Sequence, residues 1–276
     1  MWMRWIAVCS SAALISLNIF AESEAGADAA ESRPEPEFPA LEPGQSGTIA
    51  LGSGVELALV WIEALKFWVG KYEVTNGQYR RFNTSHVSKP WARHVLDGDD
   101  QPAVYVSWNQ ARQYCAWLTR RIKGKWPEGW LFRLPSAKEW ETCARCGDAR
   151  EFPWGNEWPP PNDWNYRGEE GLWAPVRLFT HDKVIRGHTD KFVVSAPVAS
   201  SGSNILGVFG MGGNVWEWCR DEFSEEYGTR VIMGGCWDNY QRHLLKTDWR
   251  SECAPNGTNQ VIGFRVVLAP PDSAAP

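Results

Sequence analysis

The stretch that decides the fold reads WVGKYEVTNGQYRRF, residues 68–82, and it passes from a strand pattern to a helix start. The apolar run that begins at Phe67, together with residues 54–59, predicts a β-hairpin. Thr75 and Gln78 then match a capping box, in which the hydroxyl accepts an early backbone N–H and the Gln side chain reaches back. We therefore expect a hairpin that leads directly into a helix.

Two further helix starts of the same kind follow. Ser107 with Gln110, and Ser136 with Glu139, repeat the capping box. The helix after Ser107 is the clearest, because its apolar residues recur at helical spacing. These residues are Trp108, Ala111, Cys115, Leu118 and Ile122. The next helix is expected over residues 137–144.

The remaining chain carries a long loop and then strands. Residues 147–205 are rich in Gly, Pro, Asn, Asp and Trp and predict a long ordered loop, which is usually functional or held by something. Antiparallel strands are expected over residues 215–220, 230–233 and 263–268. Helices and antiparallel strands in this order predict an α+β domain with little regular structure.

The two ends of the chain are expected to lie outside the fold. Residues 1–21 resemble a secretory signal peptide, with a short basic start and an apolar run; an uncleaved anchor is the alternative, but the run is short for a span. Residues 22–47 predict an acidic, Pro-rich linker. The folded domain is expected over residues 48–269, with a flexible tail at 270–276. The predicted location is therefore exported, periplasmic or extracellular, with no membrane span after cleavage.

Composition limits the classes of function. The 276 residues are 43% hydrophobic and carry a net charge of −5, which fits a globular protein and not a basic nucleic-acid-binding one. The chain has 18 Trp, so much of its burial must come from large side chains whose indole N–H needs a partner. Phosphate-binding, nucleophile-elbow and zinc-protease motifs do not occur.

Cysteine usage fits an exported protein. Six Cys remain beyond the predicted signal peptide, and an oxidising compartment favours disulfides. Cys115 lies on a helical apolar stripe and is expected to be a buried free thiol. Cys143 and Cys146 form a C-x-x-C without a second metal-binding pair, so a disulfide to Cys236 or Cys253 is favoured over a zinc site.

Seven stretches, in this order, resemble the sulfatase-modifying factor family, the domain of the formylglycine-generating enzyme. They are residues 68–82, QPAVYVSWNQARQYCAWL (101–118), FRLPSAKEWETCAR (132–145), FPWGN (152–156), GNVWEW (213–218), RVIMGGCW (230–237) and IGFRVVL (262–268). The resemblance implies a variant of the C-type-lectin-like fold that is low in regular structure and often held by calcium. It does not by itself fix an activity.

The resemblance also implies where a copper site would lie. The family enzyme binds Cu(I) with two Cys and oxidises a sulfatase Cys with O2; the matching positions here are Asn239 and Leu244. An amide and an alkyl group cannot replace two thiolates, so copper is not expected and catalysis stays open. A relocated site from Cys236, His243 and Cys253 is the alternative; a disulfide with a surface His is favoured.

A polar and aromatic groove is a further hypothesis near the same positions. Its candidate residues are Trp237, Asp238, Asn239, His243 and Arg250, with Arg242 beside them. Scattered loop side chains are the equal alternative.

Two calcium sites are implied by the family motifs. The first consists of the Asn165 and Asp190 side chains and the Tyr166 and Phe192 carbonyls, all hard oxygen ligands; turn capping without metal is the alternative. The second is formed by Gly210, Gly213, Val215 and Glu217, and it is weakened because Gly210 offers no side-chain ligand. A hydrogen bond to Glu217 from a backbone or indole N–H is the alternative.

Three functions remain open on the sequence. The chain is a modifying enzyme without the usual copper pair, a non-catalytic module that binds a peptide or glycan, or a structural protein of the cell envelope. The expected partner is an extended peptide or an exported protein, with no nucleic acid.

Overall fold

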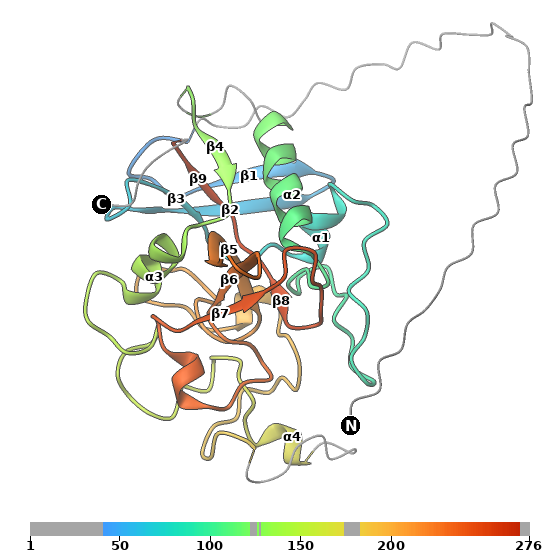
Figure 1. Ribbon diagram of the computed structural model, residues 1–276, viewed down its shortest axis with the longest axis vertical. Helices are drawn as coiled ribbons and strands as arrows, with labels where there is room; N and C mark the ends of the chain where they lie inside the picture. Colours follow the sequence, from blue (N-terminus) through green and yellow to red (C-terminus); the bar gives the residue numbers. More distant parts are fainter. Residues whose placement is uncertain (1–40, 122–125, 127, 174–182, 271–276) are drawn as a thin grey trace, which may run out of the picture. The chain divides into compact units, whose positions relative to one another are not determined.

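The protein is described by a computed structural model that covers residues 41–121, 126, 128–173 and 183–270. The predicted signal peptide, most of the predicted linker and residues 271–276 lie outside the described residues. The chain forms two sheets with helices and long loops around them, which confirms the α+β class (Figure 1). No helix within the described ranges combines the length and apolarity needed to cross a membrane.

The first sheet has the strand order β1-β2-β3-β9-β4. The predicted hairpin is confirmed, because β2 and β3 pair antiparallel with Trp61 opposite Trp68. Strand β1, at the start of the folded part, adds to this hairpin; here Leu41 is buried and the Trp68 indole donates to the Gln45 carbonyl at 2.8 Å. The strands are β1 (Gly47–Gly52), β2 (Val55–Ile62), β3 (Phe67–Gly70), β4 (Leu131–Arg133) and β9 (Val267–Ala269).

All three predicted capping boxes form. They start α1 (Asn76–Arg80), α2 (Trp108–Arg121) and α3 (Ala137–Arg145). At α2, the Ser107 N–H donates to Gln110 Oε1 at 2.9 Å and the Gln110 N–H donates to Ser107 Oγ at 3.3 Å. The buried face of α2 is the predicted apolar stripe with Tyr114 added; Ile122 lies outside the described residues.

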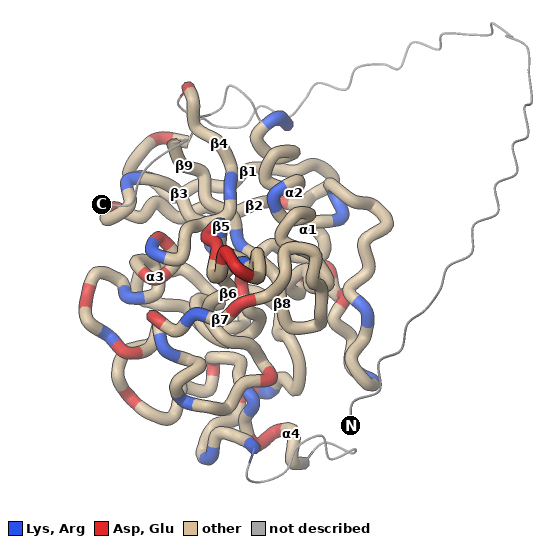
Figure 2. Tube along the Cα trace, viewed as in Figure 1, with Lys and Arg blue, Asp and Glu red and all other residues tan. Residues whose placement is uncertain are grey.

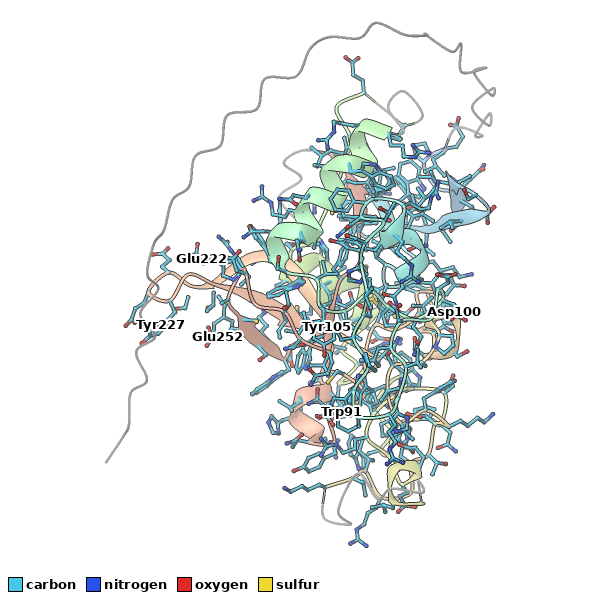
Figure 3. The ribbon with its side chains drawn as sticks, turned by 90° about the vertical axis from the view of Figure 1, so that its right-hand side faces the viewer. Trp91, Asp100, Tyr105, Glu222, Tyr227 and Glu252 are labelled. Atoms are coloured by element: carbon cyan, nitrogen blue, oxygen red, sulfur yellow. The ribbon has the colours of Figure 1, made fainter. Side chains whose placement is uncertain are left out.

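The second sheet has the order β7-β6-β5-β8. Its strands are β5 (Trp216–Ser224), β6 (Thr229–Met233), β7 (Arg250–Cys253) and β8 (Ile262–Gly263). The expectation of only antiparallel strands is wrong, because β8 runs parallel to β5. The chain crosses from β7 at one edge to β8 at the other and arrives in the same direction as β5. Figure 3 shows the β5–β6 hairpin, with Glu222 and Tyr227, extending away from the rest of the domain.

The long loop is ordered by packing rather than by regular structure. Between residues 147 and 205 the described part contains only α4 (Glu170–Trp173) and a 3-10 turn, η1 (Val198–Ser200). A second such turn, η2, spans Arg242–Leu245. Phe152, Trp164 and Tyr166 form a separate apolar cluster in this region. Buried indoles find partners as expected: Trp218 donates to the Val106 carbonyl at 2.9 Å.

The predicted disulfide is wrong. All six cysteines in the described part of the chain are free thiols. Cys143 is buried with the side chains of α3, whereas Cys236 is packed in the other main core cluster and Cys253 is half-buried on β7. The predicted free, buried thiol of Cys115 is confirmed.

Candidate functional site

The loop after β6 holds Asn239, the residue that the sequence resemblance matches with the first copper ligand of the family enzyme. Gly234 and Gly235 have φ values of +98° and +73°, which glycine adopts without strain, and they turn the chain sharply. The Asn239 side-chain oxygen accepts the Cys236 backbone N–H at 2.9 Å and faces the Cys236 thiol at 3.3 Å. Asn239 is therefore a structural acceptor that closes the loop.

Leu244 lies across the same turn. A side chain at Gly235 would contact both the Asn239 side-chain oxygen and the Leu244 carbonyl, each at 3.4 Å, so these two positions lie close together. The Leu244 side chain packs against the apolar cluster of Phe152 and Tyr166. Asn239 thus carries an amide oxygen that already accepts a hydrogen bond, and Leu244 carries a half-buried side chain that packs on an apolar cluster.

The alternative site from Cys236, His243 and Cys253 is not assembled. Cys236 is buried, and burial raises the pKa of its thiol well above the ordinary value. His243 is exposed on η2 with its ring against Trp249 at 4.8 Å, while Cys253 lies on β7. Across the described ranges, no three His, Cys, Asp or Glu side chains are arranged to hold a metal ion.

The predicted groove residues are divided between the core and the surface. Trp237 is 1% exposed and packs edge-on against Trp91, labelled in Figure 3, with ring centroids 5.0 Å apart, so it does not line an open groove. Asp238 forms an ion pair with Arg167. Arg250 lies on β7, 3.6 Å from Glu141. These side chains occupy separate surroundings and do not form one groove.

An exposed aromatic and cationic surface lies instead around η2. We call it the η2 surface and define it by Tyr240, Arg242, His243, Lys246 and Trp249. Arg242 stands over the rings of Phe152 and Trp158 at 5.3 and 5.4 Å and donates to Glu151 at 2.9 Å. Trp249 is 37% exposed beside His243. Held arginine and exposed aromatic side chains are typical of binding surfaces.

The four residues of the first predicted calcium site lie together. The carboxylate of Asp190 accepts the backbone N–H groups of Tyr166 and Phe192, both at 2.8 Å. The Asn165 amide donates to the Val194 carbonyl at 2.9 Å. Its side-chain oxygen is buried and has no hydrogen-bond partner in the described part of the chain. A cation bound there would satisfy this oxygen.

Two residues that the sequence analysis did not predict, His188 and Glu170, lie close to Asp190 of the first predicted calcium site. His188 Nε2 lies 3.6 Å from Asp190 Oδ2, and the other ring nitrogen faces the Pro160 carbonyl at 3.1 Å. Burial, followed by the charge of Asp190, raises the pKa of Glu170 to about 7. The region therefore holds two carboxyl groups, the half-buried Glu170 and the buried Asp190, and burial disfavours the ionised form of each.

The second predicted calcium set meets a different environment. Both oxygens of Glu217 are bonded to Arg265, at 2.6 and 2.5 Å, and the Trp140 indole donates to one of them at 2.8 Å. Gly210 has φ +62°, and a side chain there would overlap the carboxylate of Glu73. Both carboxylate oxygens of Glu217 are thus taken by a buried guanidinium and an indole, and the alternative of an indole hydrogen bond to Glu217 is confirmed.

This environment is a buried polar network that the motifs did not predict. Asn214 donates to Glu73 at 2.9 Å and accepts the Ala196 N–H at 2.8 Å, and it also accepts the Asn165 amide at 3.1 Å. Burial raises the pKa of Glu73 to about 8, opposed by the charge of Arg265. The sequence did offer a signal for this network, because Glu73 in YEVTN and Arg265 in GFRVV are charged residues among apolar neighbours.

The sequence and the fold resemble those of known proteins. A family model described as sulfatase-modifying factor enzyme 1-like domain matches residues 28–270. The formylglycine-generating enzyme of Streptomyces coelicolor is 33% identical over 195 residues, 63% of this chain and 55% of that protein. The inactive C-alpha-formylglycine-generating enzyme 2 of Bos taurus is 33% identical over 173 residues, 59% of this chain and 49% of that protein. The chain thus spans about half the length of these relatives.

Solved structures show the same fold at low identity. Treponema denticola variable protein 1 has a TM-score of 0.61 and 18% identity, covering 82% of this chain and 99% of that chain. PvdO from Pseudomonas aeruginosa has a TM-score of 0.59 and 21% identity, covering 83% and 100%. The expected variant of the C-type-lectin-like fold is confirmed, and the chain belongs to the family of the sulfatase-modifying factor enzyme 1-like domain.

Proposed function

We propose that this chain keeps the family scaffold as an exported binding protein and does not carry out the copper-dependent oxidation of cysteine. The observation that carries the proposal is the bonding of Asn239. At the position where the family enzyme presents a thiolate, its side-chain oxygen closes a loop with Cys236. Its neighbour Leu244 packs into an apolar cluster.

The chemistry of the remaining thiols supports the same conclusion. Cu(I) selects thiolates, and a thiolate forms only where its surroundings stabilise the negative charge. Burial raises the thiol pKa values of Cys236 and Cys253, which favours the protonated form in both. The similarity to a relative named as an inactive formylglycine-generating enzyme is consistent with this.

An extended peptide or an exported protein is the partner class that we propose. The η2 surface supports it, because an exposed Trp249 offers stacking, and Arg242 and Lys246, which share the single carboxylate of Glu151, leave a net positive charge for charged hydrogen bonds. The basic start and apolar run of residues 1–21 support export.

Oxidation of a test peptide separates this function from that of the family enzyme. We expect the purified protein, supplied with Cu(I) and O2, to leave the thiol of a Cys-x-Pro-x-Arg peptide unchanged, as measured by mass spectrometry. The double variant Asn239→Cys/Leu244→Cys should gain Cu(I) binding in competition with a chelator, because the Asn239 side chain and the Leu244 backbone both lie beside Gly235. Conversion of the peptide to formylglycine by the wild-type chain would contradict the proposal.

We infer that the first calcium site is retained. Asn165 and Asp190 would supply side-chain oxygens and Tyr166 and Phe192 their carbonyls. The buried, unpartnered oxygen of Asn165 supports this assignment. Calcium there would neutralise the carboxylate of Asp190, whose pKa is raised chiefly by burial, and would hold the long loop against the core.

Chelation tests the calcium site through stability alone. We expect calcium at 100 times its dissociation constant to raise the free energy of unfolding by about 2.7 kcal/mol, and EDTA to remove the increase. Asp190→Asn should abolish the difference between the two melting curves, whereas the exposed control Asp163→Asn should keep it. Identical melting of the wild type with calcium and with EDTA would refute the site.

A further inference from the structure

A separate cavity of about 620 Å³ opens beside α2, between this helix, β4 and the chain at Arg220 on β5. Its apolar wall includes Leu131 and Phe132. None of its residues belongs to the η2 surface or to the predicted calcium sets. A volume of this size, with mostly apolar walls and a few polar groups, is typical of small-molecule sites.

The charge of this cavity has one sign. Four arginines line it, namely Arg112, Arg120, Arg133 and Arg220, and its lining contains no aspartate or glutamate. This contrasts with the net charge of −5 for the whole chain. Figure 2 shows the basic segments of α2 and β4 lying next to each other, and the two elements pack together. Cationic side chains are therefore collected at one place in an acidic protein.

Among the described residues, Arg133 is the one of these four arginines that forms a direct ion pair, and the charge of Arg220 also acts on the same partner, Glu139. Arg133 is bonded to Glu139 through both terminal nitrogens, at 2.7 and 2.8 Å. Arg112, Arg120 and Arg220 form no ion pair or hydrogen bond through their side chains with any residue in the described ranges. The Arg112 guanidinium lies over the Trp108 ring at 4.7 Å, a contact that positions the group without cancelling its charge.

The helix also leaves space for a ligand between two of the cations. Arg112, Ala116 and Arg120 are spaced by four residues and so lie along one face of α2. Ala116 lines the cavity, and its small side chain leaves the volume between the two arginines open. The arrangement is a row of guanidinium groups above an apolar wall.

We propose that this cavity binds an amphipathic organic anion, with a sulfonate, sulfate or carboxylate group held by Arg112, Arg120 and Arg220. The apolar body of the ligand lies on the half-buried Leu131 and the exposed Ala116. Guanidinium groups suit planar and tetrahedral oxyanions because they donate paired hydrogen bonds. An anion without an apolar body would leave the wall exposed, and a neutral ligand would leave the cations unpaired.

The test uses two fluorescent probes that share one body. 8-Anilino-1-naphthalenesulfonate carries a sulfonate, whereas N-phenyl-1-naphthylamine is its neutral analogue. We expect the sulfonate to bind the full chain at one site, and the neutral probe to bind at least roughly tenfold more weakly, the ratio that corresponds to about 1.4 kcal/mol. Competition with decanoate and with inorganic sulfate compares anions with and without an apolar body; only decanoate should displace the probe at equal concentration.

Variants locate the site. Arg112→Gln, Arg120→Gln and Arg220→Gln should each weaken sulfonate binding, the triple variant by at least roughly tenfold. Arg112→Lys keeps the charge but loses the paired hydrogen bonds, so it should weaken binding less than Arg112→Gln does. Ala116→Phe, which fills the space between the arginines, should block the probe without a change of charge. Arg186→Gln removes one charge from an exposed position elsewhere and should have no effect. Unchanged melting temperatures establish that the variants are folded.

Several results would overturn the proposal. They are equal binding of both probes, displacement by sulfate as effective as by decanoate, full binding by the folded triple variant, or equal weakening by Arg186→Gln. Because the oxidation assay uses a different ligand, failure of this site leaves the proposed function unaffected, and the reverse also holds.

Discussion

Replacing Arg265 by leucine should lower the free energy of unfolding by about 3–5 kcal/mol, because it leaves the Glu217 carboxylate buried without its cation. Arg265 is fully buried, bonds both oxygens of Glu217, and also donates to the Gly70 and Phe209 carbonyls at 3.0 and 2.8 Å. Its loss removes the only ion pair that Glu217 forms among the described residues. Urea unfolding followed by tryptophan fluorescence measures the change.

A double-mutant cycle gives the sharper test of this ion pair. Removing both partners in Arg265→Leu/Glu217→Leu should cost less than the sum of the single variants, since no unpaired charge of that pair remains. Arg186→Leu, at an exposed position, should change stability by less than about 0.5 kcal/mol. Additive single effects, or a cost below about 1 kcal/mol for Arg265→Leu, would show that the pair is not an interacting buried unit.

The stability of the wild type should fall as pH rises from about 4.5 to about 8, and Glu73→Gln should reduce this fall. The pKa of Glu73 is raised from 4.5 to about 8, with burial as the largest cause. Between these values the folded chain holds a proton that the unfolded chain has released, so unfolding is favoured as protons become scarce. One such proton corresponds to a slope of about 1.4 kcal/mol per pH unit. Below 4.5 both states are protonated, and above 8 both are ionised, so the contribution of Glu73 is constant there.

Unfolding curves at several pH values isolate Glu73 from the other titrating groups. The difference between the wild type and Glu73→Gln should grow in favour of the variant as pH increases through this window. The exposed Glu226→Gln on the β5–β6 turn removes the same carboxylate without burial and should keep the wild-type slope. Equal slopes for Glu73→Gln and the wild type would mean that Glu73 is ionised in the folded chain at low pH.

Local patterns predicted the local structure well. The capping boxes at Thr75, Ser107 and Ser136 depend on residues three positions apart, and all three form in the structure. The hairpin of β2 and β3 likewise follows from alternation within one short segment. Such features need no knowledge of distant contacts, so they can be predicted from sequence.

Features that depend on tertiary contacts were predicted poorly. The parallel pairing of β8 with β5 depends on the path of the chain from β7, which no local pattern specifies. Trp237 is adjacent to polar residues in the sequence, yet Trp91 from a distant segment covers it. The expected disulfide failed for the same reason, because Cys143 and Cys236 belong to different core clusters.

The packing of Glu73 against Gly210 restricts how this protein can evolve. Asparagine tolerates a positive φ, so the backbone at position 210 alone would accept the side-chain ligand that the family places there. The glutamate carboxylate already occupies that space. A side-chain ligand at position 210 therefore requires replacement of both Gly210 and Glu73. If asparagine appears at position 210 first, its side chain overlaps the Glu73 carboxylate until Glu73 also changes.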